Sequence, residues 1–283
     1  MRRIFILLMV IMAASTVFGQ QKNKDTFSYK VGNYEVILLA ESQGQGNTGI
    51  LVGATPEMIQ KAIPDGTFAN AMNAFLVKTP DKIYLIDTGL GQKLLQNMQS
   101  VGVAPEQVNT IIITHMHNDH IGGMLKDGKV VFPNAEVILG EVERNYWANA
   151  DREAPKNVLK EYNNKLTIIQ PRKIGDTLPD KDGFYFMEAY GHTPGHICCL
   201  IKSGKEQLMV WADLTHAMAI QMPYPEVAVT YDTDPNMAIK SRKAVLEYVT
   251  KHKIPVAGMH VPYPSIGKVE ASKGGGYKFI PAK

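Results

Sequence analysis

The amino-acid sequence predicts a layered domain that mixes β-strands with α-helices, in the α/β or α+β class. Two observations support this prediction. Nine short apolar runs have strand character, and five segments with helical character lie among them. Strands and helices that are mixed in this way are typical of layered domains, although periodicity alone does not choose between the two classes.

The expected elements follow one another from residue 34 to residue 258. Strands are expected where apolar residues run together between polar or turn-forming residues, at 34–40, 74–77, 82–87, 110–113, 136–139, 184–189, 197–201, 208–212 and 254–258. Helices are expected around 91–100, 118–126, 141–149, 155–163 and 235–252. The glycine-containing segment 41–49 is expected to be a flexible loop.

The last expected helix has its own start signal. Asp234 can accept hydrogen bonds from the first helical turn, and Pro235 suits the first helical position. The apolar residues of 235–252 then fall largely on one face. This helix is therefore expected to be part of the scaffold.

The N-terminus has the composition of a secretory signal. Arg2 and Arg3 precede an apolar stretch from Ile4 to Ala14, and small residues lie near its end, namely Ala13, Ala14, Ser15 and Gly19. A permanent membrane-spanning helix needs about 20 apolar residues. We therefore expect a cleaved signal peptide over residues 1–19, a single domain over residues 20–283, and a periplasmic or secreted protein without a stable membrane anchor. A short uncleaved anchor is the alternative.

Charge and cysteine content count against a nucleic-acid-binding protein and against a disulfide-stabilised one. Removal of Arg2 and Arg3 leaves 28 Lys and Arg against 27 Asp and Glu, so the formal net charge falls from +3 to +1. A near-neutral domain does not suggest a nucleic-acid partner. Cys198 and Cys199 are adjacent and would point to opposite faces of a strand, which favours two buried thiols over a disulfide.

Histidines are concentrated in four short segments. Three lie in the motif HMHNDH (115–120), and the others lie in GHTPGH (191–196), WADLTH (211–216) and GMH (258–260), while His252 stands apart. Each segment follows an expected strand, so a sheet edge can bring them into a common cleft. In an extended segment residues two apart share a face, so His115 and His117 can converge on one metal ion. Asp119 and His120 can then face a second position.

The donor types indicate the metal. Imidazole and carboxylate groups without thiolate suit Zn²⁺, with Fe, Mn, Ni and Co left open. A polar loop without a metal role is the alternative, and four potential ligands in six residues disfavour it.

These motifs, with DTG at 87–89, occur in the order found in the metallo-β-lactamase superfamily, which the chain resembles. The segment 211–249 and the following AGMHVPYPSIG resemble the branch that contains methyl parathion hydrolase and secreted lactonase-like hydrolases. The resemblance implies a four-layer αββα sandwich of the α+β class, with two divalent metal ions at one edge. It implies His115, His117 and His192 as ligands of the first ion and Asp119, His120 and His260 as ligands of the second, with Asp213 as the bridging ligand.

A two-metal site of this kind suits hydrolysis. We expect a metal-activated hydroxide to attack a lactone, a carboxylic ester or an organophosphate ester, and Asp119 to pass a proton to the leaving group. Many lactonases of the superfamily have a tyrosine three residues after the bridging aspartate, where this sequence has His216. His216 would donate to the developing oxyanion or, as we prefer, orient a metal ligand. This departure counts against efficient acyl-homoserine-lactone hydrolysis. We expect His196 and Asp87 to orient ligands as well.

Substrate and assembly leave several alternatives open. The partner is expected to be a small ester or lactone, and a homodimer stays open. An apolar mouth would draw on aromatic residues and methionines, although each could equally belong to the core: Phe68, Met72, Trp147, Met218, Met222 and Tyr224. The rival functions are a metallo-β-lactamase that hydrolyses β-lactams, a redox di-iron protein and a metal-binding module without catalysis.

Overall fold

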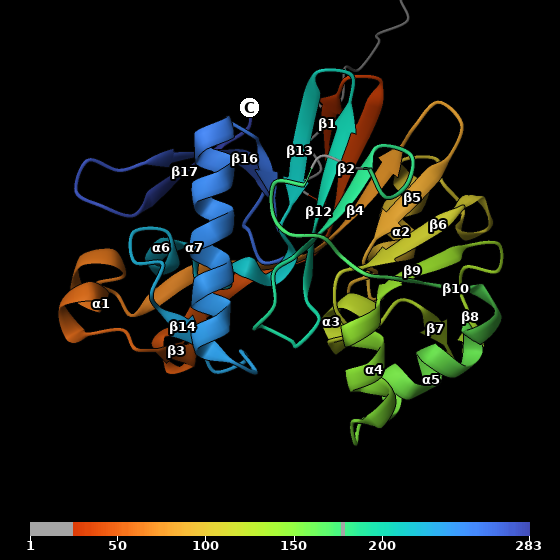
Figure 1. Ribbon diagram of the computed structural model, residues 1–283, viewed down its shortest axis with the longest axis horizontal. Helices are drawn as coiled ribbons and strands as arrows, with labels where there is room; N and C mark the ends of the chain where they lie inside the picture. The colour runs from red at the N-terminus through yellow and green to blue at the C-terminus, as the bar shows by residue number, and fades with distance from the viewer. Residues whose placement is uncertain (1–24, 177–178) are drawn as a thin grey trace, which may run out of the picture.

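Two β-sheets lie face to face with helices on their outer sides (Figure 1), in a computed structural model that describes residues 25–176 and 179–283. The expected signal peptide lies outside the described residues. The first sheet has the order β1-β2-β4-β5-β6-β9-β10. Its strands are β1 (Thr26–Val31), β2 (Tyr34–Asn47), β4 (Thr67–Lys78), β5 (Ile83–Ile86), β6 (Thr110–Ile113), β9 (Glu136–Gly140) and β10 (Leu166–Ile169).

The second sheet has the order β11-β12-β13-β15-β16-β17. Its strands are β11 (Phe184–Glu188), β12 (Ile197–Ser203), β13 (Glu206–Val210), β15 (Val256–Ala257), β16 (Ile266–Ala271) and β17 (Tyr277–Pro281). β12 is antiparallel to β11 and to β13, whereas β15 is parallel to β13. The carboxyl ends of β11, β13 and β15 therefore lie at one edge of this sheet.

A continuous apolar layer joins the two sheets. Leu38 and Phe75 from the first sheet meet Ile201 and Val210 from the second, and all four are fully buried. Alternation along a strand sends neighbouring side chains to opposite faces. Accordingly Cys199 belongs to this layer while Cys198 packs on the helical side of the second sheet, and both are free thiols.

Helices complete the four layers. On the first sheet lie α2 (Leu94–Ser100), α3 (Asn118–Ile121), α4 (Glu141–Asn149) and α5 (Glu153–Glu161), and α7 (Pro235–His252) lies on the second. As the sequence predicts, the Asp234 side chain accepts a hydrogen bond from the Met237 amide and Pro235 begins α7. Val245, Leu246 and Val249 bury the inner face of this helix. The predicted αββα arrangement is confirmed.

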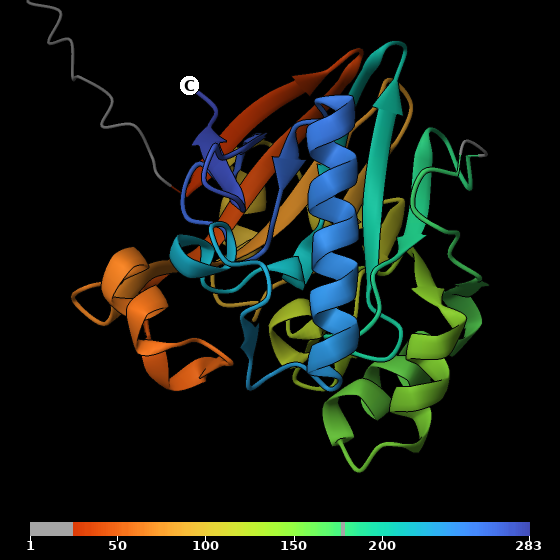
Figure 2. The ribbon, with the colours of Figure 1, turned by 60° about the vertical axis from the view of Figure 1, so that its left-hand side comes forward.

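A smaller unit projects from the sandwich beside the long strands β2 and β4 (Figure 2). It contains α1 (Pro56–Ala62), α6 (Met218–Gln221) and the pair β3 (Leu51–Val52) and β14 (Ala228–Val229). Ile63, Phe68 and Ile220 form its separate apolar cluster. The segments around residues 50 and 220, far apart in sequence, thus lie together.

Two local expectations were wrong. The segment 41–49 is no loop through most of its length, because β2 continues to Asn47 and pairs with β4 from Gln43↔Ala71 to Asn47↔Thr67, after an irregularity at Ala40/Ser42. The expected helix 118–126 ends as α3 at Ile121. A Cβ atom on Gly123 would lie 2.5 Å from the Thr88 carbonyl oxygen, so this close approach admits glycine alone, and the chain continues into β7 (Leu125–Lys126), which pairs with β8 (Lys129–Val130).

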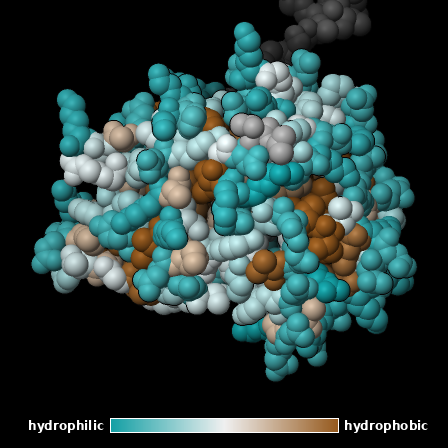
Figure 3. Space-filling model, in the orientation of Figure 1, coloured by the Kyte–Doolittle hydropathy of each residue, from teal (hydrophilic) through white to brown (hydrophobic). Residues whose placement is uncertain are grey.

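Several short or half-exposed strands lack a run of apolar residues and were not predicted from the sequence. They are β1, β10, β16 and β17, the last two of which carry a glycine-rich turn between them. Their backbone pairing, and not burial of both faces, places them in the sheets. Among the described residues, none of the helices has the length and apolar character to cross a membrane. The face in Figure 3 is mainly hydrophilic, with small separate apolar areas.

Candidate metal centre

The four histidine-containing segments meet at one edge of the sandwich. The segment after β6 carries His115 and His117, and the segments after β11, β13 and β15 carry His192, Asp213 and His260. The strand directions of the second sheet place its three segments at the same edge. The convergence expected from the sequence therefore has a simple topological cause.

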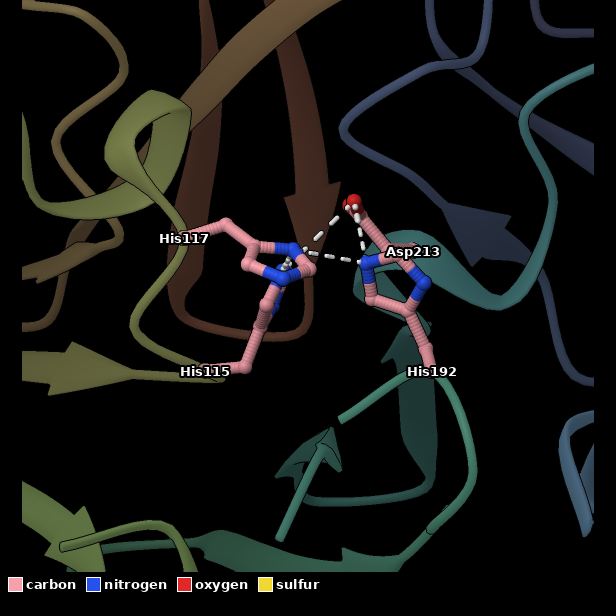
Figure 4. Close-up of side chains that lie close together, drawn as sticks. All are labelled: His115, His117, His192 and Asp213. Atoms are coloured by element: carbon pink, nitrogen blue, oxygen red, sulfur yellow. Dashed lines mark hydrogen bonds and ion pairs between the residues drawn. The ribbon is translucent and has the colours of Figure 1, made fainter. Parts of the chain in front are cut away.

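The first group contains His115, His117, His192 and Asp213, whose potential ligand atoms all lie within 4.8 Å of one another (Figure 4). His117 Nδ1 is 3.1 Å from His115 Nε2 and 3.0 Å from His192 Nε2. Asp213 Oδ2 is 3.3 Å from His192 Nε2 and 3.6 Å from His115 Nε2. Three ring nitrogens and one carboxylate oxygen thus face a common point.

The second group contains Asp119, His120, Asp213 and His260, again within 4.8 Å. Asp213 Oδ1 is 3.1 Å from His120 Nε2, and Asp213 Oδ2 is 3.0 Å from His260 Nε2. Asp119 Oδ2 lies 3.5 Å from His260 Nε2 and 3.8 Å from His120 Nε2. Because Asp213 belongs to both groups, its carboxylate lies between two adjacent positions.

The polar atoms of this cluster fit metal ions. His120 Nε2 and Asp213 Oδ1 are buried and face each other at 3.1 Å, yet neither makes a hydrogen bond of good geometry among the described residues. Buried polar atoms without partners are costly in a folded protein. A cation between these donors would satisfy both atoms, and nitrogen and oxygen donors without thiolate match Zn²⁺.

Three of the inward-facing histidines, His120, His192 and His260, are held from behind through their other ring nitrogen. Asp87 Oδ2 lies 2.7 Å from His120 Nδ1, and Asp232 Oδ1 lies 3.0 Å from His192 Nδ1. The Ala71 carbonyl oxygen lies 2.8 Å from His260 Nδ1. Such partners select the tautomer that presents Nε2 to a metal.

Burial and neighbouring charges shift the pKa values of the clustered groups in opposite directions. Burial lowers the pKa of His117, and neighbouring His192 adds to this effect, so the value falls to about 3. Burial also acts to lower the pKa of His192, but hydrogen bonds to Asp213 and Asp232 outweigh it and raise the value to about 9. Burial alone would raise the pKa of Asp213, and the charges of His120 and His260 instead hold it well below its usual value. The centre therefore combines an ionised carboxylate with protons that a metal ion would displace.

The other two histidines of the motifs take different positions. His196 uses both ring nitrogens, since Nδ1 lies 2.9 Å from the Ala189 carbonyl oxygen and Nε2 accepts from the Asp213 amide at 3.1 Å. It holds the Asp213 segment and belongs to neither group. His216 Nε2 lies 3.1 Å from Asp213 Oδ2, and its ring stacks on His260 at a centroid distance of 4.6 Å. His216 thus contacts the shared carboxylate and also lines the cavity.

The backbone is strained where it presents the cluster. Asp87 and Ala212 have φ angles of 55° and 52°, in the left-handed region that disfavours residues with a Cβ atom. Each such residue costs on the order of 1 kcal/mol. Asp87 holds His120 and donors of Thr114, and Ala212 immediately precedes Asp213. Strain of this kind concentrates at functional sites.

A cavity of about 580 Å³ opens above the cluster. Met72, Trp147, Arg152 and Tyr231 form part of its wall. Of the six apolar residues considered for the mouth, only Met72 and Trp147 line this cavity. The others pack in interior clusters or against them, namely Phe68, Met218, Met222 and Tyr224.

Three supporting residues were missed by the sequence analysis. Asp232 orients His192, Asn73 donates to the Gly258 and Val261 carbonyl oxygens beside His260, and Glu143 binds two of the four segments. Each lies in a strand, helix or loop where one polar residue has no distinguishing sequence pattern. Only their contacts across the fold reveal them.

Comparisons with known proteins point to one superfamily. The family model of the metallo-beta-lactamase superfamily matches residues 69–251. An N-acyl homoserine lactonase from Bacillus sp is 24% identical over 209 residues, covering 63% of this chain and 76% of that protein.

Two solved structures are similar over almost their whole length. The hydrolase AbOPH of the beta-lactamase superfamily has a TM-score of 0.84 and 26% identity, covering 92% of this chain and 98% of its own. AidC, a dizinc quorum-quenching lactonase in complex with its product, has a TM-score of 0.82 and 29% identity, covering 91% of this chain and 97% of its own.

Proposed function

The chain belongs to the metallo-β-lactamase superfamily, and from this premise we propose that it is a dinuclear zinc hydrolase that cleaves lactones or related esters. One observation carries the proposal: five histidines and two aspartates from four segments form two adjacent groups that share Asp213. The name of AidC as a dizinc lactonase supports zinc as the metal and a lactone as the substrate. We propose carboxylic and organophosphate esters as substrates as well, because attack on either one places negative charge on the carbonyl or phosphoryl oxygen.

We assign the ligands by group. His115, His117 and His192 would hold the first ion, and Asp119, His120 and His260 the second. Asp213 would bridge them, because its Oδ2 faces the first group and His260 while its Oδ1 faces His120. When bound, two divalent ions polarise the carbonyl or phosphoryl group of the substrate and lower the pKa of attacking water.

We assign to Asp119 the transfer of a proton from the attacking water to the leaving group. Its carboxylate is about a quarter exposed and lines the cavity. Burial acts to raise its pKa, but the charges of His120 and His260 lower it overall, so the group is ionised at neutral pH and can accept a proton. The attacking water would give up this proton, and its transfer from Asp119 to the leaving oxygen, as the ester bond to that oxygen breaks, would complete cleavage.

We assign His216 an orienting role in preference to donation to the developing oxyanion. Its Nε2 lies 3.1 Å from Asp213 Oδ2, and donation along this contact would fix the orientation of the bridging carboxylate. We therefore retain it as an orienting residue that also forms part of the substrate cavity. This role differs from that of the tyrosine expected in lactonases.

Ligand substitutions test the proposal directly. His115→Ala should lose zinc from the first group and Asp213→Ala from both groups. Each should lose at least about 10³-fold in turnover, because several kcal/mol of charge stabilisation disappear. His252→Ala is the matched control, since His252 belongs to neither group. Zinc content by mass spectrometry and turnover of γ-lactones, phenyl acetate and a paraoxon-type ester are the measurements. Full activity of the zinc-free variants would disprove the proposal, and nitrocefin as the preferred substrate would favour the β-lactamase alternative.

We also propose that the chain is exported. The basic and apolar N-terminal residues support cleavage of a signal peptide and a periplasmic or secreted location. Fractionation of cells that express the full chain, with N-terminal sequencing of the product, tests this. A cytoplasmic product that retains residues 1–19 would refute it.

A further inference from the structure

Glu143 is a buried carboxylate that contacts two metal-ligand segments at once. It lies in α4, its side chain is completely buried, and it belongs to neither metal group. We propose that Glu143 is a positioning residue that sets the geometry of the first group by linking the segment of His115 and His117 to the segment of His192. The inference rests on the proposed metal centre and assigns a role to a residue outside it.

Both carboxylate oxygens are fully engaged, one with each side of the link. Oε1 accepts from the Met116 amide at 2.8 Å and from Trp147 Nε1 at 2.5 Å. Oε2 accepts from Thr193 Oγ1 at 2.7 Å and from the Gly195 amide at 3.0 Å. Met116 lies between His115 and His117, and Thr193 follows His192, so neither segment can move without breaking a hydrogen bond to the same carboxylate.

Close packing around Glu143 restricts movement of the two segments that it joins. A Cβ atom on Gly195 would lie 2.2 Å from the Glu143 backbone nitrogen, so the His192 segment rests directly on the start of α4. The Ile197 amide also donates to the Thr114 carbonyl oxygen at 3.1 Å, which joins the same two segments. His117 Nδ1 and His192 Nε2 are consequently held 3.0 Å apart.

Trp147 extends the effect of Glu143 to the cavity. Its ring is perpendicular to that of His117 at a centroid distance of 5.6 Å, and it lines the cavity wall. The hydrogen bond to Glu143 fixes the indole. One carboxylate therefore positions three ligands and a wall of the substrate cavity.

The second group provides an internal comparison because it has a different support. His120 is held by Asp87 and His260 by the Ala71 carbonyl oxygen, and no hydrogen bond joins Glu143 to either residue. Loss of the Glu143 carboxylate should therefore weaken the first group selectively. A residue that only stabilises the fold would weaken both groups alike.

Glu143→Gln tests this because the amide keeps the shape but can accept at only one end. The substitution is made in two backgrounds: His260→Ala, which leaves only the first group intact, and His117→Ala, which leaves only the second. Zinc is titrated into each metal-free protein by calorimetry, and thermal unfolding shows that each protein is folded. We expect zinc affinity to fall about 10- to 100-fold in the His260→Ala background and to stay within about twofold in the His117→Ala background.

A milder variant protects the test from a folding defect. Thr193→Val removes one of the four hydrogen bonds and should lower first-group affinity about threefold to tenfold, again without an effect on the second group. Equal losses in both backgrounds, or no loss in the first, would overturn the role of Glu143. If neither parent background binds zinc, the metal centre itself is refuted, and this inference with it.

Discussion

Gly258→Ala should damage the second metal group through a steric clash that the structure makes measurable. Gly258 lies two residues before His260, and a Cβ atom there would lie 2.2 Å from Trp211 Nε1, against 3.4 Å for an ordinary contact. Trp211 is completely buried, and the Gly258 carbonyl oxygen accepts a hydrogen bond from Asn73. Relief therefore needs a displacement of the His260 segment, and the difference between the two distances is about 1.2 Å.

A displacement of that size exceeds what metal coordination tolerates. Ligand distances in metal sites hold within about 0.2 Å, so His260 would leave the second position. We expect zinc affinity of this group to fall about 10- to 100-fold and the free energy of unfolding to fall by about 1–3 kcal/mol. The assay is zinc calorimetry in the His117→Ala background, which leaves only the second group intact.

Gly274→Ala is the matched control because a Cβ atom there meets nothing within 4 Å and the backbone needs no positive φ. It should retain parental zinc affinity and stability. If Gly258→Ala also binds zinc with parental affinity, the segment absorbs the clash elsewhere. The reasoning from close packing to ligand geometry would then be refuted.

Two further outcomes follow from the charges at the centre. His192, with a pKa raised from 6.5 to about 9, stabilises the metal-free fold below pH 6.5, and this contribution is lost as pH rises through about 9. Zinc must displace the proton of His192, so zinc binding at pH 7.5 should release protons into weakly buffered solution. Zinc affinity should also rise toward pH 9, and a pH-independent affinity would contradict this. Arg152 is the one lysine or arginine that lines the cavity within the described ranges. Arg152→Gln should raise KM about threefold for carboxylate-bearing esters and leave neutral esters unchanged, as steady-state kinetics on matched substrate pairs would show, whereas equal changes in both would exclude charge recognition.

The sequence predicted the scaffold where burial is regular. Runs such as TIII at 110–113 are buried on both faces, and the cap at Asp234 with the apolar face of 235–252 identified α7 almost to the residue. The glycine-containing second half of β2 was read as a loop because its residues are polar and partly exposed. Its strand conformation depends on pairing with β4, and no local sequence pattern predicts that pairing.

For the candidate site, the sequence by itself determined the donors, since clustered histidines and aspartates are informative at short range. HMHNDH and the three other segments contain every residue of both metal groups. Asp87 and His196 could be predicted as supporting residues, but only the tertiary structure decided how the other donors are held. Glu143, Asp232 and Asn73 each act across more than 25 residues of sequence, through hydrogen bonds whose partners adjoin only after the two sheets pack together. A single buried polar residue has no periodicity or spacing, so its role exists only in the folded contacts.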